Sequence, residues 1–326
     1  MTPELFSEIL PPAAATGDLM LHPTPQTHTP RPPGLSDSFA PLRVRSASAE
    51  ALAPGSEAEA AAFLSERPVH AVNLLSLLRD NGLESPHNRG TFYGYRDERG
   101  RLEGVALVGH ATLFEARTER ALRSLARAAQ QAAGLHLVLG EAGPVAEFWR
   151  HYRAGGHQPM RLACRELLFE LERGAAADPP AAGPTPRLAT PEDLALVMPV
   201  QALMAEEESG VNPLAADPEG FRRRCLRRIE CGRTWVVTDG GRLLFKAEVM
   251  GDSGRVVYLE GIHVAEGERG RGLGLGCLSW LAGELLRRAD SVCVLVNEHN
   301  EAAQRLYRRA GFRFLGHYDT IFLGRD

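Results

Sequence analysis

Strand-like and helix-like segments follow one another in the same order in two successive blocks of the chain. Each block opens with a short extended segment, at 42–45 and at 187–189, that leads into the start of a helix. Each block closes with an amphipathic helix ending in Arg-Ala-Gly and then two strand-like segments. These closing segments are 145–154, 158–163 and 165–171 in the first block, and 301–310, 312–315 and 319–323 in the second. The shared order indicates one plan of elements used twice.

The second block predicts a mixed sheet with flanking helices. Its expected elements are helices at about 191–205 and 218–231, strands at 234–238, 243–250 and 256–264, a glycine-rich turn, a helix to residue 288, a strand at 291–296 and a helix from about 300. Short turns such as Asp239-Gly240-Gly241 join the early strands, so these pair antiparallel, whereas the later helix allows a parallel crossover. The fold class is therefore α/β in the α+β sense: two similar domains, each a mostly antiparallel mixed sheet flanked by helices.

Two stretches lack such periodicity. Residues 1–41 are rich in Pro, Thr and Ala and predict a disordered tail. Residues 174–186 carry four prolines and predict an interdomain linker. The expected domains are then 42–173 and 187–326, which suits a chain of 326 residues.

Composition excludes several classes of protein. With 37 basic and 41 acidic residues the net charge is −4, which argues against a general nucleic-acid binder. No apolar run of 18 or more residues predicts a membrane span, and Glu4 and Glu8 stand where a secretory signal needs basic residues. The five cysteines form no CxxC pair, so we expect a cytoplasmic protein with no metal site. Lys246 is the only lysine, so an arginine in a motif carries less information than a glycine does.

The segment Glu268-Arg269-Gly270-Arg271-Gly272-Leu273-Gly274-Leu275-Gly276 lies between a predicted strand and a predicted helix. Glycines there let the backbone approach a ligand, and the amides at the start of the helix can bind phosphate oxygens. The glycine spacing matches neither a dinucleotide-binding GxGxxG turn nor a P-loop.

The spacing Arg269-x-x-Gly272-x-Gly274, followed by Asn297-x-x-Asn300-x-x-Ala303-x-x-Leu306-Tyr307-x-x-Ala310-Gly311-Phe312, resembles the GNAT superfamily of acyl-CoA-dependent N-acetyltransferases. The resemblance covers the second block. It implies acetyl-CoA as co-substrate and Tyr307 as the acid for the departing thiolate. It implies that the coenzyme contacts Ile262, His263, Val264, Arg269, Gly270, Arg271, Gly272, Leu273, Gly274, Asn297 and Asn300.

The base is expected on the strand before the glycine-rich turn. Strict alternation puts Tyr258, Glu260, Ile262 and Val264 on one face, and Leu259, Gly261 and His263 on the other. Glu260 is the candidate base, directly or through water, with a salt-bridged or substrate-orienting acid as the alternative.

Several of the other candidate residues also fit purely structural roles. Tyr307 has helical spacing that also suits a core residue, and His263 fits an ordinary buried histidine. Glu206–Glu208 either are solvated or attract a cationic amine, and Lys246 fits a pair with Glu248.

The first block lacks the phosphate motif. Aligning Gly311 with Gly155 gives a shift of 311 − 155 = 156, which places Ala116, Thr118 and His151 at the positions of Gly272, Gly274 and Tyr307. We therefore expect a degenerate GNAT-like domain that binds no coenzyme A and instead covers the sheet edge or shapes the acceptor site.

The sequence thus predicts an enzyme that transfers acetyl from acetyl-CoA to the amine of a small molecule or peptide by direct attack in a ternary complex. An acyl-CoA sensor without turnover is the alternative, and a scaffold that binds no coenzyme A is a further one. No nucleic-acid or membrane partner is expected. The acceptor and the oligomeric state stay open.

Overall fold

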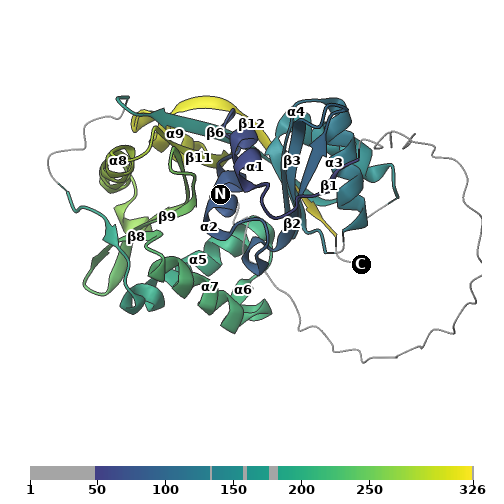
Figure 1. The fold of residues 1–326 in the computed structure, drawn as a ribbon. Coiled ribbons are helices and arrows are strands. Elements are labelled where there is room, and N and C mark those ends of the chain that lie inside the picture. Colours follow the sequence, from purple (N-terminus) through teal and green to yellow (C-terminus); the bar gives the residue numbers. More distant parts are fainter. Residues whose placement is uncertain (1–47, 133, 157–159, 176–182, 325–326) are drawn as a thin grey trace, which may run out of the picture.

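The computed structural model describes residues 48–132, 134–156, 160–175 and 183–324. The predicted tail 1–41 and residues 176–182 of the predicted linker lie outside these ranges. We call residues 48–175 the first half and residues 183–324 the second half. Figure 1 shows the two halves side by side, with helices on both sides of the strands.

In the second half the elements follow the predicted order, with the short helix α6 in addition, and the predicted extended segment 42–45 of the first block lies outside the described residues. In the first half they are β1 (Glu50–Ala51), α1 (Glu57–Leu64), α2 (Val72–Asn81), β2 (Gly90–Arg96), β3 (Leu102–Gly109), β4 (Ala111–Ala116), α3 (Glu119–Gln131), β5 (Leu137–Glu141), α4 (Ala142–Arg153) and β6 (Met160–Glu172). In the second half they are β7 (Arg187–Leu188), α5 (Leu194–Ser209), α6 (Pro213–Ala216), α7 (Pro218–Glu230), β8 (Thr234–Asp239), β9 (Arg242–Asp252), β10 (Val256–Val264), α8 (Leu273–Leu286), β11 (Ser291–Asn297), α9 (Glu301–Arg309) and β12 (Arg313–Leu323).

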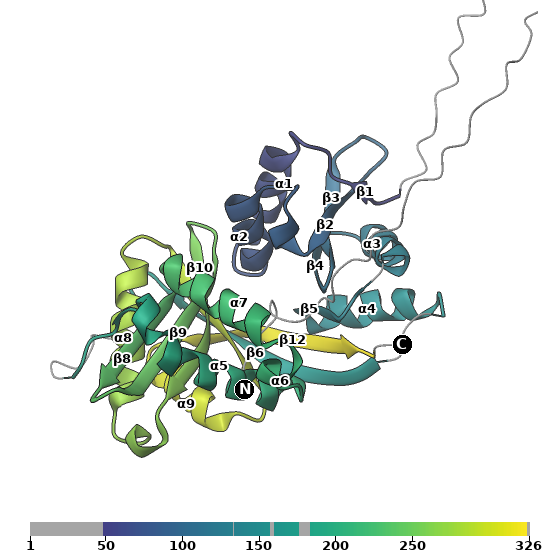
Figure 2. The ribbon, with the colours of Figure 1, turned by 90° about the horizontal axis from the view of Figure 1, so that it is seen from below.

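The strands of both halves form one sheet, in the order β1-β2-β3-β4-β5-β12-β6-β11-β10-β9-β8-β7. Each half gives its last strand to the other: β6 pairs with β11, β12 pairs with β5, and β6 and β12 pair with each other, all antiparallel. The two long strands run between the halves in Figure 2. The prediction of two closing strands in each half was therefore wrong. Each half closes with one continuous strand, β6 or β12, and each of these pairs with a strand on both of its sides.

Helices cover both faces of this sheet. On β11, Cys293 and Leu295 join a core with α1 and α2, whereas the alternate residues Val292, Val294 and Val296 join a core with α8 and α9. The core under α1 and α2 also takes in Tyr258 of β10 and Tyr318 of β12. First-half helices thus pack on strands of the second half, and the halves share a hydrophobic core.

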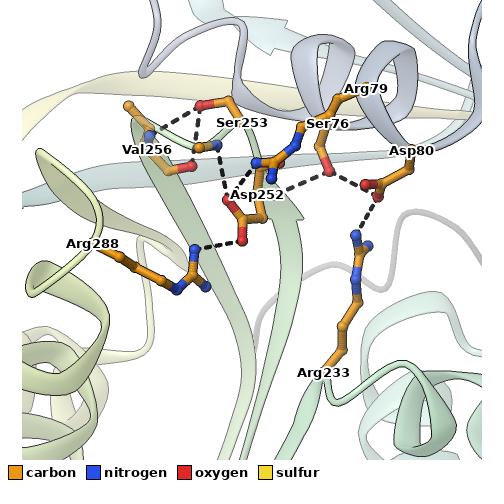
Figure 3. A network of polar contacts seen from close by, with 9 residues as sticks. Ser76, Arg79, Asp80, Arg233, Asp252, Ser253, Val256 and Arg288 are labelled. Atoms are coloured by element: carbon orange, nitrogen blue, oxygen red, sulfur yellow. Dashed lines mark hydrogen bonds and ion pairs between the residues drawn. The ribbon is translucent and has the colours of Figure 1, made fainter.

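Polar contacts add to this junction around Asp252, at the end of β9 (Figure 3). The Asp252 amide donates to Ser76 Oγ of α2 at 2.9 Å, and its carboxylate accepts from Arg79 at 3.3 Å and from Arg288 at 2.7 Å. Arg233 also forms an ion pair with Asp80 of α2. The same helix is therefore fixed to the second half by both apolar and polar contacts.

Candidate active site

Strands β10 and β11 separate halfway along their length. They pair in parallel only from Val256 with Ser291 to Leu259 with Val294. Beyond that point β11 remains paired with β6, while β10 continues to Val264 along β9. The β11-facing backbone edge of residues 260–264 is thus left without a strand partner in the described sheet, and its polar groups can pair with an extended ligand.

A bulge at Gly261 redirects the side chains at this splay. Glu260 lies opposite Glu248 and His263 lies opposite Lys246, so β10 has one residue more than β9. Gly261 has φ +58°, and a Cβ there would lie 2.8 Å from Lys246 Nζ. Ile262 and Val264 consequently pack with Leu259, while His263 shares the face of Glu260. The strict alternation predicted for 262–264 was wrong for this reason.

Glu260 is 2% exposed and lies opposite Glu248, which belongs to a buried ion pair. Lys246 Nζ lies 3.5 Å from Glu248 and donates to the Gly261 carbonyl at 3.2 Å, which confirms the predicted Lys246–Glu248 pair. Burial alone would raise the pKa of Glu248, but the charges of Lys246 and Arg228 hold it below its usual value. Both cations are therefore engaged with Glu248.

His263 is half-buried at the same splay. Burial, with the charges of Lys246 and Arg269, lowers its pKa to about 4. At neutral pH the imidazole is uncharged.

Tyr307 of α9 lies within the core on the α8 and α9 face, 2% exposed. Its ring centroid is 6.1 Å from that of Phe169 and 5.9 Å from that of Phe312. Burial, and then the charge of Glu260, raise the pKa of the Tyr307 phenol above its usual range. Tyr307 is thus a core residue that stays protonated at neutral pH and lies within electrostatic reach of Glu260.

The glycine-rich turn follows β10 and begins α8. Gly272 is the N-cap residue with φ +91°, and Gly270 has φ +75°, conformations that favour glycine. At Gly274 a Cβ would lie 2.8 Å from Val264 Cγ2, so helix and strand approach closely there. Arg269 Nε donates to the Val264 carbonyl at 3.1 Å. The first amides of α8 have no acceptor within the helix, so they are available to bind phosphate oxygens.

Asn297 and Asn300 build the turn between β11 and α9. Asn297 Oδ1 accepts from the His299 amide at 2.9 Å, and Asn300 caps α9 by accepting from the Ala303 amide at 3.1 Å. Both side chains therefore have local structural roles, and their contact with a coenzyme stays a prediction.

In the first half the equivalent strands β4 and β5 also separate, but a side chain bridges the gap between them. Strands β4 and β5 pair only from Ala111 to Leu113, while β4 runs on to Ala116. Arg67 bridges the two strand ends, lying 3.0 Å from Glu115 of β4 and 2.7 Å from Glu141 of β5. The equivalent helix α3 begins at Thr118, whose hydroxyl accepts from the Ala121 amide at 3.2 Å and whose first turn carries an acid, Glu119.

Glu119 also belongs to a surface group with Glu147 and His151, whose potential metal-ligating atoms lie within 4.8 Å of one another. Arg123 lies 2.8 Å from Glu119, and Arg150 forms an ion pair with Glu147. The carboxylates of this group are thus already paired with guanidinium groups.

Sequence reasoning missed one polar residue near the splay, Glu166 of β6. It is 1% exposed and bonded to the Thr320 hydroxyl of β12 at 2.9 Å. An available signal was an acid between Cys164 and Leu168, on the side of the strand that alternation assigns to the core.

The strands that splay and the glycine-rich helix start lie within residues 202–312, which match the model of the Acetyltransferase (GNAT) family. A search of curated proteins found no match.

Solved structures extend the likeness to both halves. A Drosophila protein is 13% identical with a TM-score of 0.62, covering 85% of this chain and 98% of its own. A GCN5-related N-acetyltransferase from Sphaerobacter thermophilus is 19% identical with a TM-score of 0.54, covering 85% and 96%. A tandem GNAT protein from the clavulanic acid biosynthesis pathway is 15% identical with a TM-score of 0.51, covering 86% and 99%. These likenesses show the fold.

No helix among the described residues has the length and apolar character needed to cross a bilayer.

Proposed function

We propose that the second half transfers an acetyl group from acetyl-CoA to an amine by direct attack in a ternary complex. The observation that carries the proposal is the splay between β10 and β11, which lies directly before the glycine-rich turn and has Glu260 and Tyr307 within electrostatic reach of each other.

The coenzyme would be held mainly by backbone groups. Its pantetheine arm would pair with the unpartnered edge of β10 at Ile262, His263 and Val264. Its pyrophosphate would lie on the amides from Gly270 to Gly274, with the exposed Arg269 and Arg271 beside them. Asn297 and Asn300 would line the opposite side of the splay.

Starting from the ammonium form of the acceptor, the reaction requires two protons to leave nitrogen and one to reach sulfur. Glu260, directly or through water, takes a proton from the acceptor ammonium, and the neutral nitrogen attacks the thioester carbonyl. The new C–N bond forms, the C–S bond breaks, and the electron pair of that bond leaves on sulfur. Tyr307, kept protonated by burial, gives its proton to the thiolate. The second proton of the attacking nitrogen then restores the Tyr307 phenol, and Glu260 releases the first proton to solvent. Backbone amides at the splay stabilise the oxyanion.

The first half would bind no coenzyme A, because Arg67 bridges its splay and Glu119 lies where phosphate would bind. It would contribute to the shared core and supply the exchanged strand β6, which borders the splay. The proposal includes a cytoplasmic location, where acetyl-CoA is available, and a small-molecule or peptide amine as acceptor rather than a nucleic acid.

Thiol release from acetyl-CoA, followed over a panel of primary amines, tests this function. Release that depends on the amine supports the enzyme. Tight binding of acetyl-CoA without release for any amine would instead support an acyl-CoA sensor, and no binding would contradict both.

A further inference from the structure

Glu166 reaches the second half on the exchanged strand. Along β6 it lies between Asn297 of β11 on one side and Tyr318 of β12 on the other. It therefore comes from the first half in sequence but borders the end of the strand that splays from β10.

The hydrogen bonding of this carboxyl group is incomplete. Oε2 accepts from the Thr320 hydroxyl at 2.9 Å, whereas Oε1 is buried and has no hydrogen-bond partner within the described part of the chain. A buried carboxyl oxygen without a donor costs about 1–3 kcal/mol or more, so its retention calls for an explanation. Burial, opposed by the Thr320 hydrogen bond, raises the pKa of Glu166 to about 8.

Glu166 faces the candidate base across β11. The pKa of the buried Tyr258 phenol is raised by burial, then by the charge of Glu260 and by that of Glu166, so this phenol lies within reach of both acids. Because β11 separates β10 from β6 and β10 splays away from β11 after Leu259, the backbones that carry the two acids lie at least about 10 Å apart. That spacing is too long for one ammonium group and suits two.

The first half offers an internal comparison. Tyr318 lies opposite Glu141 of β5 as Glu166 lies opposite Asn297 of β11, so the two residues hold equivalent places. The Tyr318 hydroxyl is bonded to His70 Nδ1 at 2.8 Å. Glu166 thus differs from its counterpart in carrying both an acidic group and an unused acceptor atom.

We propose that Glu166 binds a second cationic group of the acceptor, which makes the substrate class a short diamine or an amine of similar length with a second ammonium. An ammonium group offers three donors and no acceptor, which complements Oε1, and its positive charge favours the ionised form of Glu166, whose proton passes to solvent when the cation binds. This assignment rests on the proposed function, since the reacting amine is the one that Glu260 deprotonates.

The test compares 1,4-diaminobutane with n-butylamine, which share their carbon chain and differ in the second cation. Thiol release is measured for the wild type, Glu166→Gln and the control Glu170→Gln on the same strand. We expect Glu166→Gln to lower kcat/KM for 1,4-diaminobutane by about tenfold or more, while the value for n-butylamine changes little. Glu170→Gln should leave the ratio of the two amines as in the wild type.

Binding of each amine to the coenzyme A complex, measured by calorimetry, gives a second readout that needs no turnover. If neither amine releases thiol, the proposed function fails, and calorimetry still decides the role of Glu166. An equal affinity of the wild type for the two amines, or a preference for the diamine that Glu166→Gln retains, would overturn the assignment and leave Oε1 as a site for water.

Discussion

Thr118 and Gly272 hold the same place in the two halves, each as the N-cap residue of the helix that follows a splayed strand. The shift here is 272 − 118 = 154, so the predicted alignment of Thr118 with Gly274 by a shift of 156 was wrong by two residues. The Thr118 side chain caps its own helix, whereas Gly272 has no side chain and leaves open space, with no atom within 4 Å of a Cβ built there. One helix start is thus closed by its own hydroxyl, and the other is open to a ligand.

Gly272→Trp should abolish the thermal shift that acetyl-CoA induces, because the indole would cover the first amides of α8. The positive φ adds a strain of about 1–2 kcal/mol, which the melting temperature without ligand will report. Thr118→Trp is the matched variant. It loses a helix cap worth about 1 kcal/mol but should retain the full acetyl-CoA shift. If acetyl-CoA still raises the melting temperature of Gly272→Trp, the glycine-rich turn is not part of the coenzyme site.

Tyr307→Phe should lower kcat by about 10²-fold or more with little change in the KM for acetyl-CoA, because it removes the acid but not the ring. Since the Tyr307 pKa lies above its usual range, the wild-type rate should show no alkaline fall from this group below about pH 10. Steady-state thiol release measures both effects, with Tyr152→Phe in the first half as control. A kcat within twofold of the wild type would leave Tyr307 as a packing residue only.

The raised pKa of Glu166 should make the free energy of unfolding depend on pH. Its pKa is about 8 in the folded protein, against an ordinary carboxyl pKa of 4.5 in the unfolded chain. Between these values the folded state binds the extra proton, so the free energy of unfolding falls as pH rises from about 4.5 to about 8. Urea unfolding at pH 6 and pH 8.5 should show a larger loss of stability for the wild type than for Glu166→Gln. Equal losses would mean that Glu166 is ionised throughout.

Asp252→Ala should destabilise the protein by roughly 1–2 kcal/mol, because it removes two partly exposed ion pairs and the hydrogen bond to the Gly254 amide. Part of this loss should disappear in 1 M NaCl, since the exposed guanidinium groups are screened by salt. Asp239→Ala, at an exposed pair whose N–O distance is 4.0 Å, is the control and should have almost no effect. Denaturant unfolding distinguishes the two, and equal effects would contradict a role for Asp252 in joining the halves.

The sequence predicted the fold class and the glycine-rich turn because both depend on local chemistry. Gly272 and Gly274 are required where they stand, one by a positive φ and the other by its contact with Val264. The degenerate turn of the first half follows in the same way from Thr118, a residue that caps a helix instead of leaving it open.

The exchange of β6 and β12 could not be predicted from periodicity. Alternation specifies which face of a strand is buried but not which neighbour it pairs with, and either half could have kept its own last strand. The position of Glu166 beside the splay depends on that exchange, so it was missed as well.

The bulge at Gly261 was missed for a different reason. A single extra residue moves every following side chain of the strand to the opposite face of the sheet. Here it placed His263 opposite Lys246. A glycine within a strand was the available signal.

Calorimetric titration with acetyl-CoA tests the central claim most directly, because it counts the sites. We predict one site per chain in the wild type and in Thr118→Trp, and none in Gly272→Trp. Two sites per chain, or a site that persists in Gly272→Trp, would contradict an account in which the second half alone binds the coenzyme.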